Sequence, residues 1–166
     1  MKGGTHVKIG TPKEILPGEA RVAMTPDSAR QLQKLGYDCA IETNAGKAAG
    51  FADSAYEEAG VEIVESAEAL WAGSDIIAKV RPPTEDELGY LDETKTLISH
   101  FYPGSNEELM KLAASKGASV IAMDMILNNL DRMRTVRSWP ESNPENIFFS
   151  KITGHVVAID SVAAWG

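Results

Sequence analysis

The sequence contains a single cysteine, Cys39, and three histidines, His6, His100 and His155, which lie far apart. A lone cysteine cannot form a disulfide within the chain, and the scattered histidines show none of the spacings typical of a metal site. We therefore expect a buried thiol in a reducing compartment and no metal centre. Ser99 precedes His100, but neighbouring strand residues point to opposite faces, so the two do not form a serine–histidine pair.

Long apolar runs and a surplus of positive charge are also missing. No stretch approaches the roughly 20 apolar residues that a membrane helix needs, and residues 1–10 lack the apolar core of a secretory signal, so we expect a chain that neither spans a membrane nor is exported. Acidic residues outnumber basic residues by 24 to 16, for a net charge of -8, which argues against a nucleic-acid surface. No G-x-G-x-x-G or G-x-x-x-x-G-K-[ST] motif follows any expected strand, so a complete nucleotide site within this chain is not expected.

Apolar runs alternate with segments of helical periodicity, which is typical of an α/β fold with parallel strands and crossover helices. The continuous apolar character of residues 75–80 and 119–126 favours strands that are covered on both faces. The sequence therefore predicts a mostly parallel sheet with helices on both faces, Rossmann-like or flavodoxin-like. The expected strands are 6–10, 37–43, 61–65, 75–80, 95–101 and 118–126, the expected helices are 26–36, 53–60, 65–74 and 103–117, and residues 82–91 are expected to form an acidic turn.

Capping signals mark the ends of several expected helices. Thr25 precedes a proline and is predicted to cap the first helix, which Gly36 ends. Asp53 is predicted to cap the second helix, and Ser105 with Glu108 is predicted to form a capping box at the start of the last one.

The pattern changes at Leu127. Residues 127–166 lose the alternation of strands and helices, contain the polar, proline-broken stretch SWPESNPEN, and balance four basic against four acidic residues. The sequence thus predicts one domain over residues 1–126 and an atypical tail over residues 127–166, packed on the same domain.

Chemistry-bearing residues follow several of the expected strands. In an open parallel sheet, ligands bind at the carboxyl ends of the strands, so these residues are expected to converge on one edge. The alternative is ordinary surface charge, and for the arginine a surface salt bridge to Glu19 or Glu14, which contributes little to stability. The candidates are Arg21, Lys79, Tyr102 and Asp124.

Two signatures carry a resemblance to a known family. Glu19 begins the motif E-x-R-V-A-x-T-P, Lys79 begins K-V-x-x-P, and the surrounding segments KIGTPKEILPGEARVAMTPDSARQLQKLGYDCAIETNAG and TLISHFYPGSNEELMKLAASKGASVIAMD extend the likeness. Over about residues 7–126 the chain resembles the N-terminal domain shared by alanine dehydrogenase and the alpha subunit of proton-translocating NAD(P) transhydrogenase.

The resemblance implies a cleft for NAD between this domain and a Rossmann domain that the chain lacks. In alanine dehydrogenase the residues matching Arg21 and Lys79 hold the substrate carboxylate and carbonyl, and the catalytic histidine falls on Tyr102. A phenol does not supply the acid and base that imine chemistry needs at neutral pH, whereas direct hydride transfer between two nicotinamides needs only proximity and orientation. The resemblance therefore favours a transhydrogenase alpha subunit in which Arg21, Lys79 and Tyr102 bind the cofactor and no residue of this chain is catalytic.

For the complete enzyme the resemblance implies hydride transfer from NADH to NADP coupled to proton translocation. It also implies a homodimer, docked on the beta subunit or membrane domain at the cytoplasmic side of the inner membrane. The tail departs from the family, since Asp131 and Arg132 stand in another order, so we expect a truncated domain that binds NAD weakly or not at all and is inactive alone. Two alternatives stay open: an alanine dehydrogenase-like domain, and a non-catalytic dimerising interaction module whose tail, with Trp139 and Trp165, covers a sheet edge or pairs with a second copy.

Overall fold

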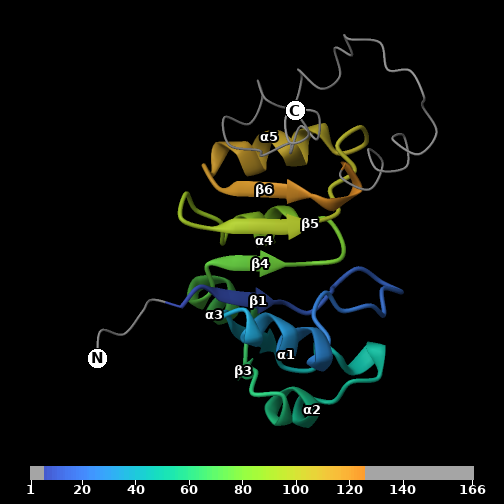
Figure 1. The fold of residues 1–166 in the computed structure, drawn as a ribbon. Helices are drawn as coiled ribbons and strands as arrows, with labels where there is room; N and C mark the ends of the chain where they lie inside the picture. The colour runs from blue at the N-terminus through green and yellow to red at the C-terminus, as the bar shows by residue number, and fades with distance from the viewer. Residues whose placement is uncertain (1–5, 126–166) are drawn as a thin grey trace, which may run out of the picture.

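The structure, a computed structural model, describes residues 6–125, and the fold is given for these residues (Figure 1). They form a six-stranded sheet in the order β3-β2-β1-β4-β5-β6, in which every neighbouring pair is parallel. The expected tail over residues 127–166 lies outside the described residues. The strands are β1 (Lys8–Thr11), β2 (Asp38–Glu42), β3 (Glu62–Val64), β4 (Ile76–Ala78), β5 (Thr96–Ser99) and β6 (Ser119–Ala122).

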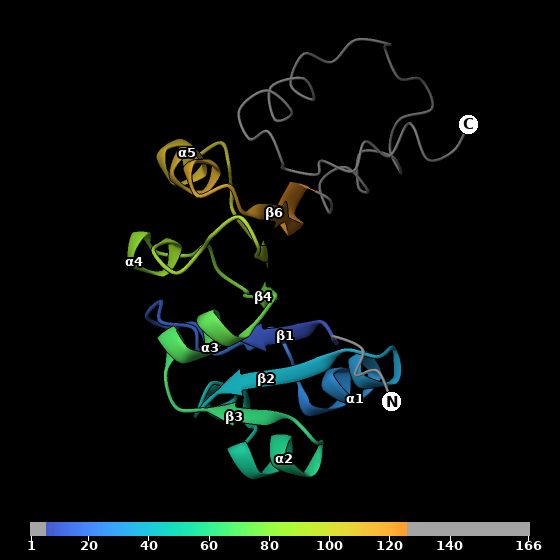
Figure 2. The same ribbon diagram turned by 90° about the vertical axis from the view of Figure 1, so that its left-hand side faces the viewer.

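Helices connect consecutive strands on the two faces of this sheet (Figure 2). One apolar cluster joins α1 and α2 to β2 through Met24, Ala29, Ile41 and Tyr56, and a second joins α3, α4 and α5 to β4, β5 and β6. The prediction of a parallel sheet with helices on both faces is confirmed. The helices are α1 (Pro26–Lys34), α2 (Asp53–Glu58), α3 (Ala67–Gly73), α4 (Glu85–Leu88) and α5 (Glu107–Ser115), with a short 3-10 turn η1 (Lys47–Ala49).

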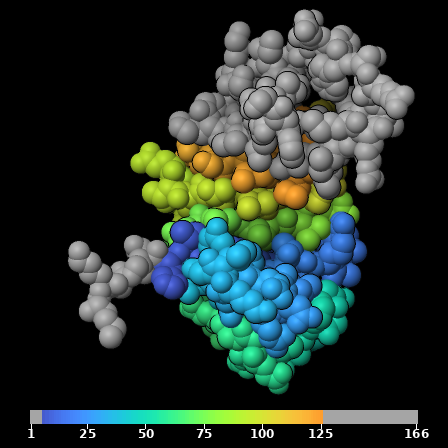
Figure 3. All heavy atoms as spheres, in the orientation of Figure 1, coloured from blue at the N-terminus to red at the C-terminus, as the bar shows by residue number. Residues whose placement is uncertain are grey.

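The strand order places a switch point between β1 and β4. The chain runs outward from β1 through β2 to β3, returns through α3, and runs outward again from β4 to β6. Figure 3 shows the result on the surface, where the last described residues, yellow to orange, lie above the first ones, blue to teal. In open α/β sheets, ligands bind outside the carboxyl ends of the strands at such a point.

The helix ends agree with the sequence only in part. Thr25 caps α1 as expected: its hydroxyl accepts from the Ser28 amide, and α1 ends before Gly36, which has a φ of +94°. The other two predicted caps are wrong. Asp53 is the first residue of α2, and its carboxylate instead accepts from the Thr43 hydroxyl and the Asn44 amide, in the turn that follows β2.

At α5 the N-cap is Asn106, which makes no side-chain cap bond but donates its amide to the Phe101 carbonyl, while Glu108 pairs with Lys111. The predicted turn over residues 82–91 contains the short helix α4 instead. Thr84 and Glu87 form a capping box there. Within the described part of the chain, no helix has both the length and the apolar character needed to cross a lipid bilayer.

Gly10 allows α3 to pack directly on β1. A Cβ atom at this position would lie 2.2 Å from Oγ and 2.9 Å from Cβ of Ser74. Replacing Gly10 with alanine is therefore expected to destabilise the fold by about 1–3 kcal/mol through overpacking, as measured by urea unfolding. Gly73→Ala is the matched control, since no heavy atom lies within 4 Å of its added Cβ. Equal losses in the two variants would contradict this explanation.

Candidate functional site

Glu14 bridges the two loops that leave β1 and β4 at the switch point. Its Oε1 atom accepts from the Val80 amide at 2.6 Å, and its Oε2 atom accepts from the Arg81 amide at 3.4 Å. The side chain is 4% exposed. A carboxylate buried in this way fixes the backbone of both loops, because buried amide groups need partners.

Lys79 follows β4, as the sequence predicts, but its side chain is buried rather than placed on a rim. Only 1% of the side chain is exposed, and Nζ donates to Oε1 of Glu87 at 2.6 Å, while Oε2 of Glu14 lies 3.6 Å away. One ammonium thus faces two buried carboxylates. These partners offset part of the cost of removing the ammonium from water.

Arg21 lies on the long connection between β1 and α1, and it is held by one buried carboxylate. Its Nε and Nη2 atoms donate to the two oxygens of Glu19 at 2.8 and 2.7 Å, and Nε of Arg81 donates to the same carboxylate. Glu19 is 3% exposed, whereas Arg21 is 61% exposed and Arg81 35% exposed. The pairing of Arg21 with Glu19 agrees with the salt-bridge alternative, except that the carboxylate is buried and is shared with a second guanidinium, that of Arg81.

The two guanidinium groups govern the protonation of this cluster. The hydrogen bonds from Arg21, with a further one from Arg81, hold the pKa of Glu19 well below its usual value. In return Glu19 raises the pKa of Arg21, with smaller electrostatic contributions from Tyr102 and Glu14.

Tyr102 follows β5 and has a strained backbone with a φ of +48°, uncommon for a residue with a side chain. Asp124, from the segment after β6, holds this conformation: its carboxylate accepts from the Phe101 amide at 2.7 Å and from the Tyr102 amide at 3.1 Å. The Tyr102 ring is 41% exposed and stacks on His100 with ring centroids 5.9 Å apart. His100 Nδ1 lies 2.8 Å from the Val80 carbonyl, so the loops after β4 and β5 are joined as well.

The structure thus brings the predicted residues to one edge of the sheet, linked through carboxylates. Lys79 connects to Glu14, Glu14 to the backbone of Arg81, and Arg81 through Glu19 to Arg21. Sequence reasoning missed three members of the cluster, Arg81, Glu87 and the bridging role of Glu14. The only signal for Arg81 is its place within K-V-x-x-P.

Tyr56 anchors the segment that carries Arg21. It is fully buried, and its hydroxyl donates to the Met24 carbonyl at 2.8 Å, which ties the end of the β1–α1 connection to α2. Burial, together with the nearby charge of Asp53, raises the pKa of Tyr56 to about 12. The connection is therefore held at both ends, by Glu14 near β1 and by Tyr56 near α1.

This raised pKa predicts a loss of stability in alkali. The phenol ionises near pH 10 in the unfolded chain but near pH 12 in the folded chain, so its contribution is complete below pH 10 and is lost as the pH rises toward 12. Urea unfolding between pH 8 and 12 is expected to show a steeper decline for the unchanged chain than for Tyr56→Phe. At neutral pH the variant is expected to lose about 1–2 kcal/mol, because the Met24 carbonyl loses its partner. Parallel pH curves for the two chains would contradict the prediction.

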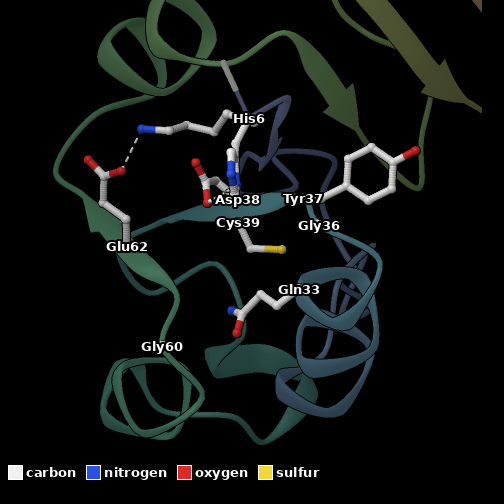
Figure 4. A pocket seen from close by; sticks show the side chains of 9 residues that line it. His6, Gln33, Gly36, Tyr37, Asp38, Cys39, Gly60 and Glu62 are labelled. Carbon is white, nitrogen blue, oxygen red and sulfur yellow. Dashed lines mark hydrogen bonds and ion pairs between the residues drawn. The ribbon is translucent and has the colours of Figure 1, made fainter. Parts of the chain in front are cut away.

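A hollow with a volume of about 430 Å³ lies at the opposite, amino edge of the sheet (Figure 4). Its charged groups already face partners: Lys8 pairs with Glu62 at 2.7 Å, and His6 lies 3.7 Å from Asp38. This hollow is separate from the cluster that contains the predicted residues.

Comparison with known proteins identifies the family. The family model described as "Alanine dehydrogenase/PNT, N-terminal domain" matches residues 10–142, which continues past the expected boundary at residue 126. The chain belongs to this family. It is 58% identical over 120 residues to NAD(P) transhydrogenase subunit alpha of Cereibacter sphaeroides and 45% identical over 118 residues to the subunit of the same name from Haemophilus influenzae. It is 37% identical over 120 residues to alanine dehydrogenase of Halomonas elongata.

Each of these relatives is much longer than the family domain. The chain spans 23% of either transhydrogenase subunit and 32% of the Halomonas alanine dehydrogenase, while 71–72% of the chain is aligned. Two solved structures agree with the fold, each with a TM-score of 0.67. The first is an L-alanine dehydrogenase that is 35% identical; the match covers 70% of this chain and 32% of the dehydrogenase. The second is a transhydrogenase from Sinorhizobium meliloti that is 32% identical; the match covers 71% of this chain and 35% of the transhydrogenase.

Proposed function

We propose that the chain is the first domain of an NAD(P) transhydrogenase alpha subunit and forms one wall of a cleft for a nicotinamide nucleotide. The observation that carries this proposal is the 58% identity to a transhydrogenase alpha subunit over 120 residues, against 37% to an alanine dehydrogenase over the same length. The cluster at the switch point supports it, because this is where open α/β sheets bind ligands.

The described residues fit part of such a nucleotide. In residues 6–125 no partner is found for Nη1 of Arg21 or for the two Nη atoms of Arg81, and guanidinium N–H groups are well matched to phosphate or carboxylate oxygens. The connection over residues 12–25 contains one glycine, Gly18, and offers no glycine-rich turn for a pyrophosphate. The chain therefore supplies one wall, and a second domain would complete the cleft.

In this proposal Arg21, Lys79 and Tyr102 contribute to cofactor binding: the exposed Arg21 and Tyr102 contact the cofactor, and the buried Lys79 acts beneath them by holding Glu14 and Glu87 in place. A bound nicotinamide supplies the hydride-transfer chemistry, and direct transfer between two nicotinamides needs no side-chain acid or base. Tyr102, held rigidly by Asp124, would exclude water from the cleft edge. NADH is the expected donor at this site, and binding by the chain alone is expected to be weak.

The complete enzyme in this proposal passes hydride from NADH to NADP and couples the transfer to proton translocation. The word subunit in the relatives' names supports an assembly with other subunits, here a beta subunit or membrane domain. We further propose a homodimeric alpha subunit that lies against the cytoplasmic side of the inner membrane.

NADH titration of the chain, followed through nucleotide fluorescence, tests the proposal. Saturable binding is expected, and Arg21→Gln is expected to weaken it by about tenfold, the effect of losing a hydrogen bond from a charged donor. Arg30→Gln is the matched control, since Arg30 pairs with Asp27 on the exposed side of α1. Absence of binding with a concentration-dependent dimer in sedimentation would instead support the interaction module. Equal affinity in the two arginine variants would remove Arg21 from the site.

Alanine dehydrogenase is the second candidate, favoured by the 37% identity to the Halomonas enzyme. It predicts alanine-dependent reduction of NAD when this domain is paired with a second, Rossmann-type domain. Activity that Tyr102→Phe abolishes would favour this candidate over the transhydrogenase.

A further inference from the structure

The carboxylate of Glu87 serves two partners at once. Its Oε2 atom accepts from the Thr84 amide at 2.8 Å and completes the capping box of α4, while its Oε1 atom accepts from Nζ of Lys79 at 2.6 Å. The Glu87 side chain is 8% exposed. The start of α4 and the ammonium of Lys79 are thus tied to a single side chain.

We propose that Glu87 is the positioning residue for Lys79, fixing its buried ammonium at the switch point, beneath the edge of the sheet that would bind nucleotide; this role rests on the proposed function. A lysine side chain is long and flexible, and holding it in one rotamer costs conformational entropy. The hydrogen bond to Glu87 orders the Lys79 side chain before a ligand binds, so binding does not have to meet this entropic cost. The hydrogen bond occupies one of the three ammonium donors, and the contact to Glu14, at 3.6 Å, is an ion pair beyond hydrogen-bond distance.

The charges of Lys79, Glu14 and Glu87 allow the positioning of the Lys79 ammonium to be tested separately from the stability of the fold. Lys79, Glu14 and Glu87 together carry a net charge of -1, and all three are buried. Glu87→Gln makes this group neutral and leaves Lys79 paired with Glu14. Glutamine is also accepted at this position of a capping box. The variant therefore replaces the negatively charged partner of Nζ with a neutral amide, and α4 and the fold are expected to persist.

Lysine acylation read by mass spectrometry tests the positioning without any nucleotide. In the unchanged chain Lys79 is expected to react slowly, and in Glu87→Gln its rate is expected to rise at least tenfold. Lys95 is the internal control, because it is also buried but donates to the Ala72 and Ser74 carbonyls. Glu85→Gln, on an exposed residue of α4, is the matched control variant and is expected to leave both rates unchanged.

Each outcome decides between the alternatives. An unchanged rate at Lys79 in Glu87→Gln would show that Glu14 alone holds the ammonium, and would overturn the proposal. Equal increases at Lys79 and Lys95 would show that Glu87 maintains the fold as a whole, which also overturns it.

NADH affinity measured on the same variants gives the functional half of the test. Glu87→Gln is expected to bind several-fold more weakly than Glu85→Gln. Faster acylation of Lys79 alone in Glu87→Gln, with no change in NADH affinity, would show that Glu87 positions a lysine that takes no part in nucleotide binding. That result would overturn the proposed role of Glu87. Absence of NADH binding in every chain, including the unchanged one, would contradict the proposed function instead.

Discussion

Replacing Lys79 with methionine is expected to destabilise the folded chain by about 3–5 kcal/mol. The substitution preserves the volume of the side chain but leaves Glu14 and Glu87 buried with no cation between them, and removing one member of a buried ion pair is strongly destabilising. Urea unfolding at pH 7, followed by circular dichroism, measures the loss.

Two companion variants make this prediction specific. Lys111→Met removes a lysine whose ion pairs with Glu107 and Glu108 are exposed, and it is expected to cost less than about 1 kcal/mol. Adding Glu87→Gln to Lys79→Met is expected to recover part of the stability, because one unpaired charge is removed. A cost for Lys79→Met no larger than that for Lys111→Met would mean that the carboxylates tolerate the loss of their cation.

Trp71→Ala is expected to cost about 3–5 kcal/mol, since it empties the largest fully buried side chain of the described core. Trp71 lies on α3 and packs in the cluster that includes Ile77, Leu97 and Phe101. A void there would separate α3 from the second half of the sheet. Thermal and urea unfolding would both report this loss.

The controls for this core prediction use neighbouring aromatic groups. Trp71→Phe is expected to cost less than Trp71→Ala, because it keeps part of the volume and removes an indole N–H that has no partner among the described residues. Tyr90→Ala removes an exposed ring that packs against Trp71, with ring centroids 6.1 Å apart, and is expected to reduce the free energy of unfolding least of the three variants. A Trp71→Ala cost equal to that of Tyr90→Ala would contradict the packing explanation.

Much of the fold follows from the sequence because its signals are local. The apolar runs predict all six strands, and the Thr25–Pro26 start of α1 is a local hydrogen-bonding pattern that tertiary contacts leave in place. Asp53 and Ser105 fail as caps for the opposite reason. The backbone amide of Asn44 competes for the Asp53 carboxylate, and α5 begins one residue after Asn106, beyond the reach of Ser105.

The sequence predicts where the candidate site lies, but not which of its side chains form ion pairs and hydrogen bonds with one another. The parallel sheet brings the residues after β4 and β5 to one edge, which is why Lys79 and Tyr102 could be selected from sequence. Glu19 and Glu87 are buried by loops that are distant along the chain. A single sequence shows that these side chains are charged but not that they are buried. The sequence therefore offers Glu19 as a surface partner of Arg21, but it does not show that this carboxylate is buried and also pairs with Arg81.

The switch point has a consequence for how the site is assembled. Arg21 and Glu14 belong to the half of the chain that ends with β3, and Lys79 and Arg81 to the half that begins with α3, with the exposed Glu65 between the halves. Cutting the chain there would give two peptides, each with an incomplete set of charges. Their recombination would restore the set, so the Lys79 ammonium could serve as a reporter of fragment complementation.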